Sequence, residues 1–324
     1  MKKNFMPVVY EHAAAFIGKS PWEVSRSGEL LYQSHRKAYE YYHHSPITVG
    51  IDIYNLEAEA YGAPVEDPGG NNIPSVRKHL FSSAKEIKSL TLFDPAGDGR
   101  VPMIIQAARR LKETYPDGDV RVPVSGPFSV AVNLVGIENL VMEAFTEGET
   151  VREALEHLGE GQVIFGKAVR EAGLGITFFE SAATPPMISP ELFGEVEFPV
   201  LKRTMDRLAE ITGSRVPCIM GGDTAPVAEY LLQTNPGFLI CPAETDQRLF
   251  MEKMKRETEI PVRINMNAGV IANGTWEEIT READRVLDLA RDRENVLIGP
   301  GVLAYNTPPE NVTRLGKYIT GRKN

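Results

Sequence analysis

The sequence predicts an α/β protein folded as a (β/α)8 barrel of the TIM type, and two features carry that prediction. Eight short runs rich in Val, Ile and Phe are each bounded by Gly, Pro or Asn, as expected for buried parallel strands. Segments with helical periodicity lie between most of these runs. Such alternation favours a parallel sheet, either closed into a barrel or open and doubly wound. We expect a single barrel domain over residues 1–324, a length that would also fit two smaller domains.

The predicted elements follow one another along the chain. The strands cover residues 7–10, 47–51, 121–126, 175–180, 215–220, 237–241, 262–266 and 295–299. The clearest helices cover residues 150–173 and 275–292. The second helix begins with Thr275, followed three residues later by Glu278, which is the spacing of a capping box.

Composition limits the class of protein. The net charge of −9 gives no reason to expect a nucleic-acid partner, and 42% hydrophobic residues is ordinary for a soluble enzyme. No apolar run approaches the roughly 18 residues of a membrane span. Glu11 and His12 interrupt the start of the chain, so we interpret it as mature protein rather than a signal peptide. Two cysteines, Cys218 and Cys241, argue against a disulfide scaffold, and we expect a cytoplasmic protein.

Polar and ionisable residues follow most of the predicted strands. In a (β/α)8 barrel the active site lies where strands end, because the loops after the strands converge there. A site needs several polar groups that meet in an apolar shell. The residues at these positions are Glu11 and His12, Asp52 and Tyr54, Ser125 to Phe128, Glu180 and Ser181, Cys218 to Thr224, Cys241 and Glu244, Asn265 and Asn267, and Gly299 to Tyr305.

The last of these loops, "GPGVLAYNTPPENV", has its own pattern. Gly299 and Gly301 would let the backbone approach a ligand closely, because glycine has no side chain. Thr307 is the expected N-cap of a helix that has Pro308 in its first turn. The alternative is that this loop only closes the barrel.

Four segments together resemble the uroporphyrinogen decarboxylase superfamily, and they occur in the family's order over most of the chain. They are "ITVGIDIYNLEAEAYGAPV", "VSGPFSVAVNLVG", "FFESAATPPMISPELFGEVEFPVLKR" and "NVLIGPGVLAYNTPPENVTRLGKYI". The superfamily contains the decarboxylases and the corrinoid-linked methyltransferases. The resemblance implies a barrel of this family's type, with the loop after the last strand beside the site.

The chain departs from the decarboxylase branch at its start. That branch has a motif whose arginines pair with the carboxylates of the porphyrinogen, a role suited to a planar, permanently charged group. The matching stretch here is "PVVYEHAAAFIG", in which His12 and Phe16 stand where the arginines would be and Glu11 is acidic. The Gly-Asn-Leu-Asp-Pro segment of the decarboxylases is replaced by "NMNAGV". The resemblance therefore favours the methyltransferase branch.

The thiol-methylating enzymes of that branch hold zinc with His-x-Cys after the fifth strand and a Cys in the last loop. Zinc lowers the pKa of a substrate thiol and holds the thiolate as nucleophile. The aligned residues here are Ile219, Gly221 and Val302, none of which can bind a metal. The zinc ligands usual in the family are thus absent, and a thiol acceptor is disfavoured.

Two interpretations remain open. A different metal site could be built from candidates such as Cys218, Cys241 and Glu180, although no pair has a metal-binding spacing and both cysteines would also fit as small packed hydrophobes. Alternatively, no metal is needed and a general acid protonates the leaving atom of a methyl donor. The candidate acids are Glu180, Glu11, His12, Asp223 and Tyr305.

We expect two groups of site residues, each with a structural alternative. The predicted catalytic residues are Glu180, Asp52, Asp223 and His12, and the predicted substrate-binding residues are Tyr54, Phe128, Asn265, Asn267, Gly301 and Tyr305. Glu180 ranks first because it ends an apolar strand where the resembled family also has an acidic residue. Asp223 would serve equally as a helix N-cap.

The resulting hypothesis is a methyltransferase of anaerobic one-carbon metabolism. It would move a methyl group between a small donor, such as a methoxyarene or a methylamine, and a corrinoid carried by a partner protein. The absent thiol-activating ligands favour the demethylating half-reaction. Two alternatives remain: a decarboxylase acting on a smaller acid, and a non-catalytic barrel that binds a corrinoid protein or a small molecule.

Overall fold

A computed structural model describes residues 4–321 of the chain. Eight of its strands form one parallel sheet, and two short strands form a separate antiparallel pair. The parallel strands are β1 (Asn4–Phe5), β2 (Ile47–Thr48), β5 (Val120–Ser125), β6 (Gly175–Phe179), β7 (Pro217–Ile219), β8 (Phe238–Cys241), β9 (Val262–Met266) and β10 (Val296–Pro300); the antiparallel pair is β3 (Val65–Glu66) and β4 (Ser75–Val76).

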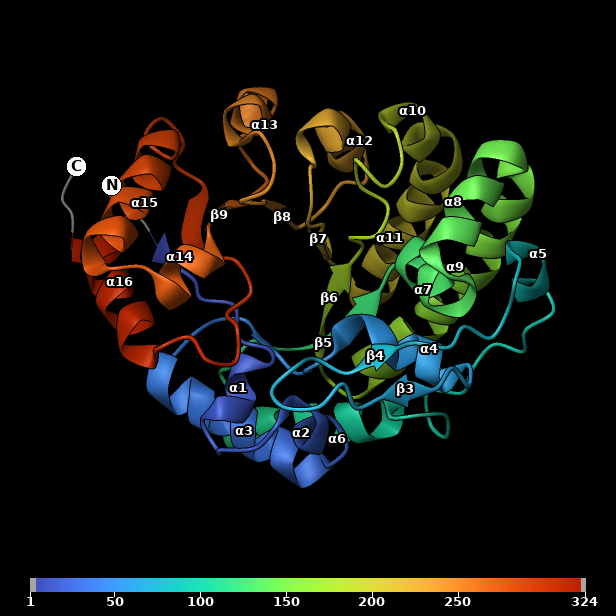
Figure 1. Ribbon diagram of the computed structural model, residues 1–324, viewed down its shortest axis with the longest axis horizontal. Coiled ribbons are helices and arrows are strands. Elements are labelled where there is room, and N and C mark those ends of the chain that lie inside the picture. Colours follow the sequence, from blue (N-terminus) through green and yellow to red (C-terminus); the bar gives the residue numbers. More distant parts are fainter. Residues whose placement is uncertain (1–3, 322–324) are drawn as a thin grey trace.

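Helices connect the strands and surround the sheet (Figure 1). They are α1 (His12–Ala15), α2 (Pro21–Ser25), α3 (Gly28–Tyr42), η1 (Ile53–Asn55), α4 (Leu56–Ala60), α5 (Ala84–Ile87), α6 (Val101–Thr114), α7 (Pro127–Val135), α8 (Ile137–Thr146), α9 (Gly148–Glu171), α10 (Pro190–Leu192), η2 (Phe193–Glu197), α11 (Phe198–Thr212), η3 (Ala225–Val227), α12 (Ala228–Gln233), α13 (Gln247–Lys253), η4 (Met254–Arg256), α14 (Ala268–Asn273), α15 (Trp276–Leu289) and α16 (Pro309–Gly321).

The order of strands in the sheet confirms the predicted barrel. It runs β1-β10-β9-β8-β7-β6-β5-β2, so strands adjacent in the sequence are neighbours and the last pairs with the first. A doubly wound sheet would instead reverse direction at a switch point. Within residues 4–321, β1 and β2 share no strand pairing, so the sheet is curled around the centre but open at this seam.

The predicted strand bounds hold for β9 and fail for β1. β9 lies at the predicted residues, whereas β1 covers Asn4–Phe5 rather than 7–10, and Val8 forms only a single bridge to Val302. Pro7 has no N–H to donate to a ladder, which explains why the strand ends before it. The pair β3–β4 is an addition that no sequence pattern predicted.

The strands divide the core into two layers, because successive side chains of a strand point to opposite faces. Ile176 and Phe178 of β6 belong to the large apolar core that the helices share with the sheet. Phe179 belongs to a smaller cluster with Val8, Tyr10 and Ile53 at the inner face of the sheet. This inner cluster separates the two ends of the barrel.

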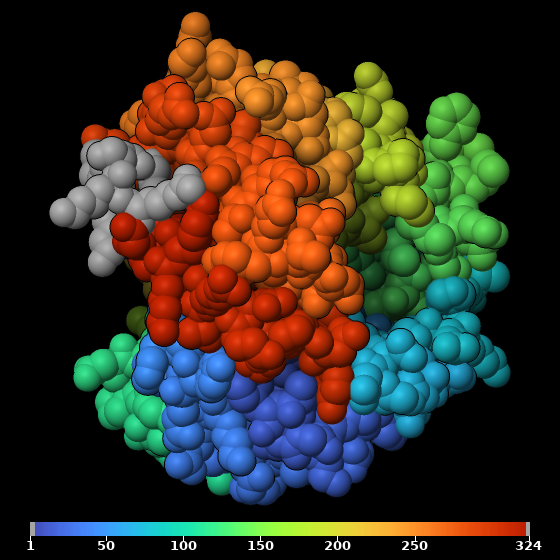
Figure 2. Space-filling model, turned by 60° about the vertical axis from the view of Figure 1, so that its left-hand side comes forward, coloured from blue at the N-terminus to red at the C-terminus, as the bar shows by residue number. Residues whose placement is uncertain are grey.

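The sequence predicts side-chain caps at Thr275 and Thr307, and the structure confirms only the first. Thr275 and Glu278 form the expected capping box at α15. The expected cap at Thr307 is wrong, because its Oγ1 atom is buried without a hydrogen-bond partner. Figure 2 shows the C-terminal residues (red) lying against the N-terminal helices (blue).

No single helix within residues 4–321 is long and apolar enough to cross a bilayer. The helices α7 and α8 meet the length and composition criteria only as a pair, and they are bent by 115° relative to each other.

Candidate functional site

The loops after β2, β6 and β7 are joined by hydrogen bonds at the carboxyl ends of the strands, which we call the mouth. The Tyr54 hydroxyl and the Ser181 Oγ lie 2.6 Å apart, and the Gly221 N–H donates to the same Oγ at 2.9 Å. The Tyr54 ring packs edge-on against Phe179, with 6.1 Å between ring centroids. Burial raises the pKa of Tyr54, so its hydroxyl is neutral. The mouth thus has an apolar floor beneath a network of neutral polar groups.

Glu180 lies directly behind this network, on the outer face of the sheet. Its carboxylate accepts hydrogen bonds from the N–H groups of Phe128 and Ser129 at 3.1 Å and from the Ser129 hydroxyl. It therefore caps α7. Gly126 makes room for it, because a Cβ atom there would lie 2.0 Å from Glu180 Oε2. Ser129 Oγ also accepts the N–H of Ser181 at 3.3 Å, which connects Glu180 to the mouth through one residue.

A second buried carboxyl, Glu197, lies beside Glu180 in the same layer. It ends the π-helical turn η2, and neither of its carboxyl oxygens has a hydrogen-bond partner among residues 4–321. Burial and the neighbouring Glu180 carboxylate raise the pKa of Glu197 well above its ordinary value. Burial raises the pKa of Glu180 to about 7. The hydrogen bonds that Ser129 donates to its carboxylate lower the pKa and offset only part of this rise. We conclude that Glu197 is protonated and that the pair shares one negative charge at most.

Asp52 lies in a buried ion pair. Arg100 donates from Nη1 to Asp52 Oδ1 at 2.8 Å and from Nη2 to Asp52 Oδ2 at 2.7 Å, and its Nε donates to Glu59. Both oxygens of Asp52 are thus occupied by a planar guanidinium. The structure places this predicted catalytic residue in a contact that stabilises the loop after β2.

His12 and Glu11 follow the first strand and differ in their contacts. The His12 Nδ1–H donates to the carbonyl of Ala304 at 3.1 Å, and Nε2 accepts from the Tyr42 hydroxyl at 2.8 Å. Burial lowers the pKa of His12, so it is neutral and holds the last loop in place. Glu11 is 8% exposed, and this burial raises the pKa of its carboxyl to about 7. A hydrogen bond from its own backbone N–H lowers the pKa but does not cancel the rise. Glu11 is therefore close to half-protonated at neutral pH.

The other predicted polar residues make structural contacts of three kinds. Asp223 accepts a hydrogen bond from Thr245 Oγ1 at 2.7 Å. Asn267 is the N-cap of α14 and accepts from Gly269 N–H at 2.9 Å. Asn265 faces the barrel interior, where its Oδ1 accepts from Arg263 Nε at 2.8 Å. The structure does not bring these three residues together with Glu180.

The predicted substrate-binding residues of the last loop and of α7 lie at different depths. Phe128 is fully buried in the core between α7 and the sheet. Tyr305 is half-buried and packs against the same core, and its carbonyl lies 3.3 Å from His12 Nδ1. A Cβ atom at Gly299 would lie 2.0 Å from the carbonyl oxygen of Met6, so the close approach there is to the chain's own β1 segment. Gly301 has space for a side chain, since the nearest atom would be 3.7 Å away.

The three positions aligned with zinc ligands offer no ligand atom. Ile219 packs against the inner cluster, Gly221 donates to Ser181, and Val302 is bridged to Val8 and is 45% exposed. Cys218 and Cys241 are both buried on the outer face of the sheet, and burial raises the pKa of each thiol. Across residues 4–321, no group of three His, Cys, Asp or Glu side chains could hold a metal ion. The residues present do not fit the family's zinc site.

Several residues that organise the site were not predicted. Ser129 and Glu197 lie in helical segments, and no local pattern separates a serine or glutamate that faces the sheet from one that faces solvent. Glu57 is fully buried, accepts the Ser125 N–H at 2.6 Å, and has a pKa raised by burial to about 7. Arg100 could be found only from the fold, because its partner Asp52 is 48 residues away.

Comparison with known proteins gives one family and a consistent set of relatives. The model of the family described as uroporphyrinogen decarboxylase (URO-D) matches residues 3–321. The chain is 24% identical over 269 residues to a methylated-thiol–coenzyme M methyltransferase of Methanosarcina mazei, covering 80% of this chain and 68% of that protein.

Solved structures extend this comparison to the fold. A methyltransferase from Methanosarcina mazei superposes with a TM-score of 0.82 at 20% identity, covering 99% of this chain and 94% of the other. A putative vitamin-B12 independent methionine synthase from Listeria monocytogenes superposes with a TM-score of 0.55 at 11% identity, covering 99% and 96%. These likenesses confirm the barrel architecture.

Proposed function

Because the chain belongs to the uroporphyrinogen decarboxylase family, we propose that it is a methyltransferase that exchanges a methyl group with a corrinoid carried by a partner protein. The similarity to a methylated-thiol–coenzyme M methyltransferase supports the methyltransferase class. The finer assignment, a donor with an oxygen- or nitrogen-bound methyl group, rests on the chemistry of the mouth.

The observation that carries the proposal is the neutral character of the mouth. A porphyrinogen decarboxylase needs arginines for several carboxylates, but the guanidinium of Arg100 is already taken by Asp52 and Glu59. A thiol-activating site needs zinc ligands, but Ile219, Gly221 and Val302 offer none. The Tyr54–Ser181–Gly221 network above Phe179 suits a small molecule without a formal negative charge.

We assign the general acid to Glu11. When a methyl group leaves an oxygen or nitrogen atom, that atom keeps the bonding electron pair and must gain a proton. The corrinoid supplies the nucleophile that takes the methyl group. Glu11 can supply the proton, since its raised pKa of about 7 keeps a substantial fraction protonated at neutral pH. After transfer, the demethylated alcohol or amine departs and Glu11 regains its proton from solvent.

Glu180 has a positioning role in this proposal. Its carboxylate fixes Ser129, whose Oγ holds the backbone of Ser181 and of Ala182 at 3.3 and 3.2 Å. Ser181 in turn orients Tyr54 and Gly221 at the mouth. A change at Glu180 therefore reaches Tyr54 through three hydrogen bonds, by way of Ser129 and Ser181, rather than by direct contact.

A groove near the mouth offers a contact surface for the corrinoid-carrying partner. It has a volume of about 750 Å³ and lies between α8 and residues 186–189, which belong to the loop after β6. Phe145 is 82% exposed and Met142 is 65% exposed along it. Large exposed apolar side chains that gather in one place are typical of surfaces that bind other proteins.

The experiment that tests this function is an anaerobic absorbance assay with the full chain and cob(I)alamin. Methoxylated aromatics, methylamines and methylated thiols are offered separately, and the spectrum reports formation of methylcobalamin. We expect conversion with an oxygen- or nitrogen-methyl donor. No conversion with any donor, also in the presence of a corrinoid protein, together with release of carbon dioxide from a small carboxylic acid, would replace methyl transfer by decarboxylation.

A further inference from the structure

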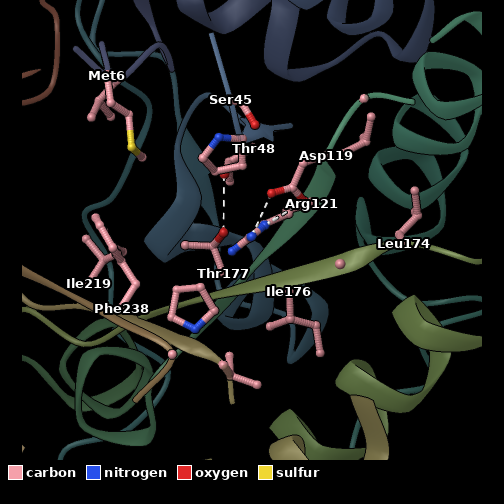
Figure 3. Close-up of a pocket in the computed structure, with 18 of the residues that line it drawn as sticks. Met6, Ser45, Thr48, Asp119, Arg121, Leu174, Ile176, Thr177, Ile219 and Phe238 are labelled. Carbon is pink, nitrogen blue, oxygen red and sulfur yellow. Dashed lines mark hydrogen bonds and ion pairs between the residues drawn. The ribbon is translucent and has the colours of Figure 1, made fainter. Parts of the chain in front are cut away.

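A cavity of about 540 Å³ opens at the end of the barrel opposite the mouth. Residues that precede or begin β5 to β9 line it, including Gly118, Leu174 and Pro261. Figure 3 shows that Thr48 and Thr177 face each other inside it, with Arg121 beside Asp119. The amino ends of barrel strands usually serve stability rather than catalysis, so an open cavity there requires an explanation.

The charges that line this cavity are predominantly positive. Five of the lining side chains are basic and one is acidic: Lys112, Arg121, Arg170, Arg215, Arg263 and Asp119. The chain as a whole carries a net charge of −9. A concentration of cations in one concave surface of an acidic protein produces a local positive potential that attracts anions.

Arg263 is the deepest of these cations and lacks a counter-ion. It is 4% exposed, and its Nε donates to Asn265 Oδ1 at 2.8 Å. No hydrogen bond or ion pair joins its Nη1 or Nη2 to another residue in the described chain, although both belong to a side chain that lines the cavity. Burial lowers the pKa of Arg263 to about 10, which leaves it charged at neutral pH.

An unpaired buried guanidinium is costly, and proteins rarely retain one without a use. Arg293 shows the usual solution, because its guanidinium donates to the carbonyls of Met254 at 2.8 Å and of Glu257 and Ile260 at 2.6 Å. Arg263 has no such set of acceptors. Its two Nη groups form a planar fork whose N–H groups match the two oxygens of a carboxylate or a phosphate.

Neighbouring groups complete a site for the rest of such a molecule. The hydroxyls of Thr48 and Thr177 are buried, lie 3.3 Å apart and line the cavity. The Phe238 ring lies with its centroid 5.9 Å from Arg263 Cζ and offers an apolar wall. Gly175 gives Arg121 its room, because a Cβ atom there would lie 3.0 Å from Arg121 Cγ.

We propose that this cavity is a binding site for a small organic oxyanion, a carboxylate or phosphate anchored on Arg263, at the end of the barrel away from the mouth. The volume is within the range of small-molecule sites. The hydroxyls of Thr48 and Thr177 donate to the same anion, and the rim cations raise its local concentration. The site does not depend on the assignment of methyl transfer, because no residue of the mouth network lines it.

The test is calorimetric titration of the full-length protein with two probes, inorganic phosphate and succinate, in a buffer free of both. We expect saturable binding of at least one probe at one site per chain. Stronger binding of phosphate identifies a tetrahedral head group, and stronger binding of succinate identifies a planar one. The absence of saturable binding of both probes overturns the proposal.

Two variants locate the binding. Arg263→Gln is expected to weaken binding about 10- to 100-fold, because charge-assisted hydrogen bonds to the anion are lost. Arg215→Gln removes the same charge from an exposed side chain at the rim, and binding is expected to stay within about threefold. Equal affinities of Arg263→Gln and the wild type contradict an anchor at Arg263.

Thermal unfolding separates this role from a structural one. Without anion, Arg263→Gln is expected to have the same or a higher Tm than the wild type, since an unpaired buried charge is removed. With anion, only the wild type should gain stability. A fall in Tm of Arg263→Gln without anion contradicts the proposal. If that variant does not fold, Arg263→Lys keeps the charge but loses the fork, and unchanged affinity in it overturns the bidentate anchor.

Discussion

The two ends of this barrel treat buried charge in opposite ways. At the mouth, Arg100 pairs with Asp52, and His12 is held neutral between Tyr42 and the carbonyl of Ala304. At the amino ends of the strands, Arg263 is buried with two nitrogens that have no partner in the described chain.

The contrast indicates which kind of molecule each end can receive. A mouth whose buried Arg100 and His12 are internally compensated suits a neutral donor, and the proton that we assign to the reaction is on Glu11. A cavity with an uncompensated cation suits an anion, because the ligand supplies the missing charge. Substitutions that alter one end at a time separate the two roles.

The largest effect is expected at the general acid. Glu11→Gln should reduce methyl transfer by roughly 10²- to 10⁴-fold, because the amide cannot protonate the leaving atom. In the wild type the rate should fall as pH rises through about 7, since the acid form of Glu11 is lost there. Rates measured from pH 6 to pH 9 check both points. A Glu11→Gln enzyme with wild-type turnover would remove Glu11 from the mechanism.

The next largest effect is on the stability of the mouth. Arg100→Gln leaves the buried carboxylate of Asp52 without its ion pair, and we expect a loss of about 3–5 kcal/mol in the free energy of unfolding. Urea denaturation measures this loss. Arg110→Gln breaks an exposed pair with Glu29 and serves as the control, for which little change is expected. Similar behaviour of the two variants would mean that the Arg100 pair does not hold the mouth together.

Two buried histidines beside β2 predict a loss of stability in acid. Burial lowers the pKa of His35 to about 4 and of His44 to about 3, below the value near 6.5 of an unfolded chain. Protonation therefore favours the unfolded state, so stability present above pH 6.5 is lost as pH falls toward 4. The expected loss is about 3 kcal/mol for His35 alone. Urea midpoints at pH 7 and pH 4.5 measure it.

The two histidines also provide a matched pair. His35 Nε2 accepts the N–H of Gly50 at 3.2 Å, whereas both ring nitrogens of His44 lack partners within residues 4–321. His44→Leu should reduce the acid sensitivity without a cost at neutral pH. His35→Leu should reduce it too, but at a cost of about 1–3 kcal/mol at pH 7 for the orphaned N–H. An unchanged acid profile in both variants would refute this origin.

The smallest effect is expected in the groove near the mouth. Phe145→Ser should leave methyl transfer to free cob(I)alamin unchanged and weaken transfer to a corrinoid protein about tenfold, because an exposed aromatic anchor is lost. Leu249→Ser alters another exposed apolar residue, on α13, and should affect neither reaction. Equal effects of both substitutions would show that the groove is not the contact surface.

The barrel was predictable because its buried strands are short, mostly apolar runs bounded by turn residues. The strand over 262–266 was predicted at its observed bounds for this reason. The first strand was misplaced because apolar character continues past Pro7, which ends the ladder.

The candidate site was less predictable, because one residue of register decides which face a side chain occupies. The position of Glu180 at the end of β6 was predicted, but it lies one residue beyond inward-facing Phe179 and so points to α7. Arg263 was passed over because it lies in the middle of a predicted strand, where nothing in the sequence shows that its partner is missing. Such contacts depend on residues far apart in the chain.

The central claim is that the mouth transfers methyl groups without a metal-held thiolate. The most direct test is single-turnover demethylation of a methoxyarene or methylamine by protein treated with a zinc chelator, with cob(I)alamin as the methyl acceptor. We predict the same rate before and after chelation, and no gain when zinc is added back. A rate that is lost on chelation and restored by zinc, or that appears only with methylated thiols, would contradict the account.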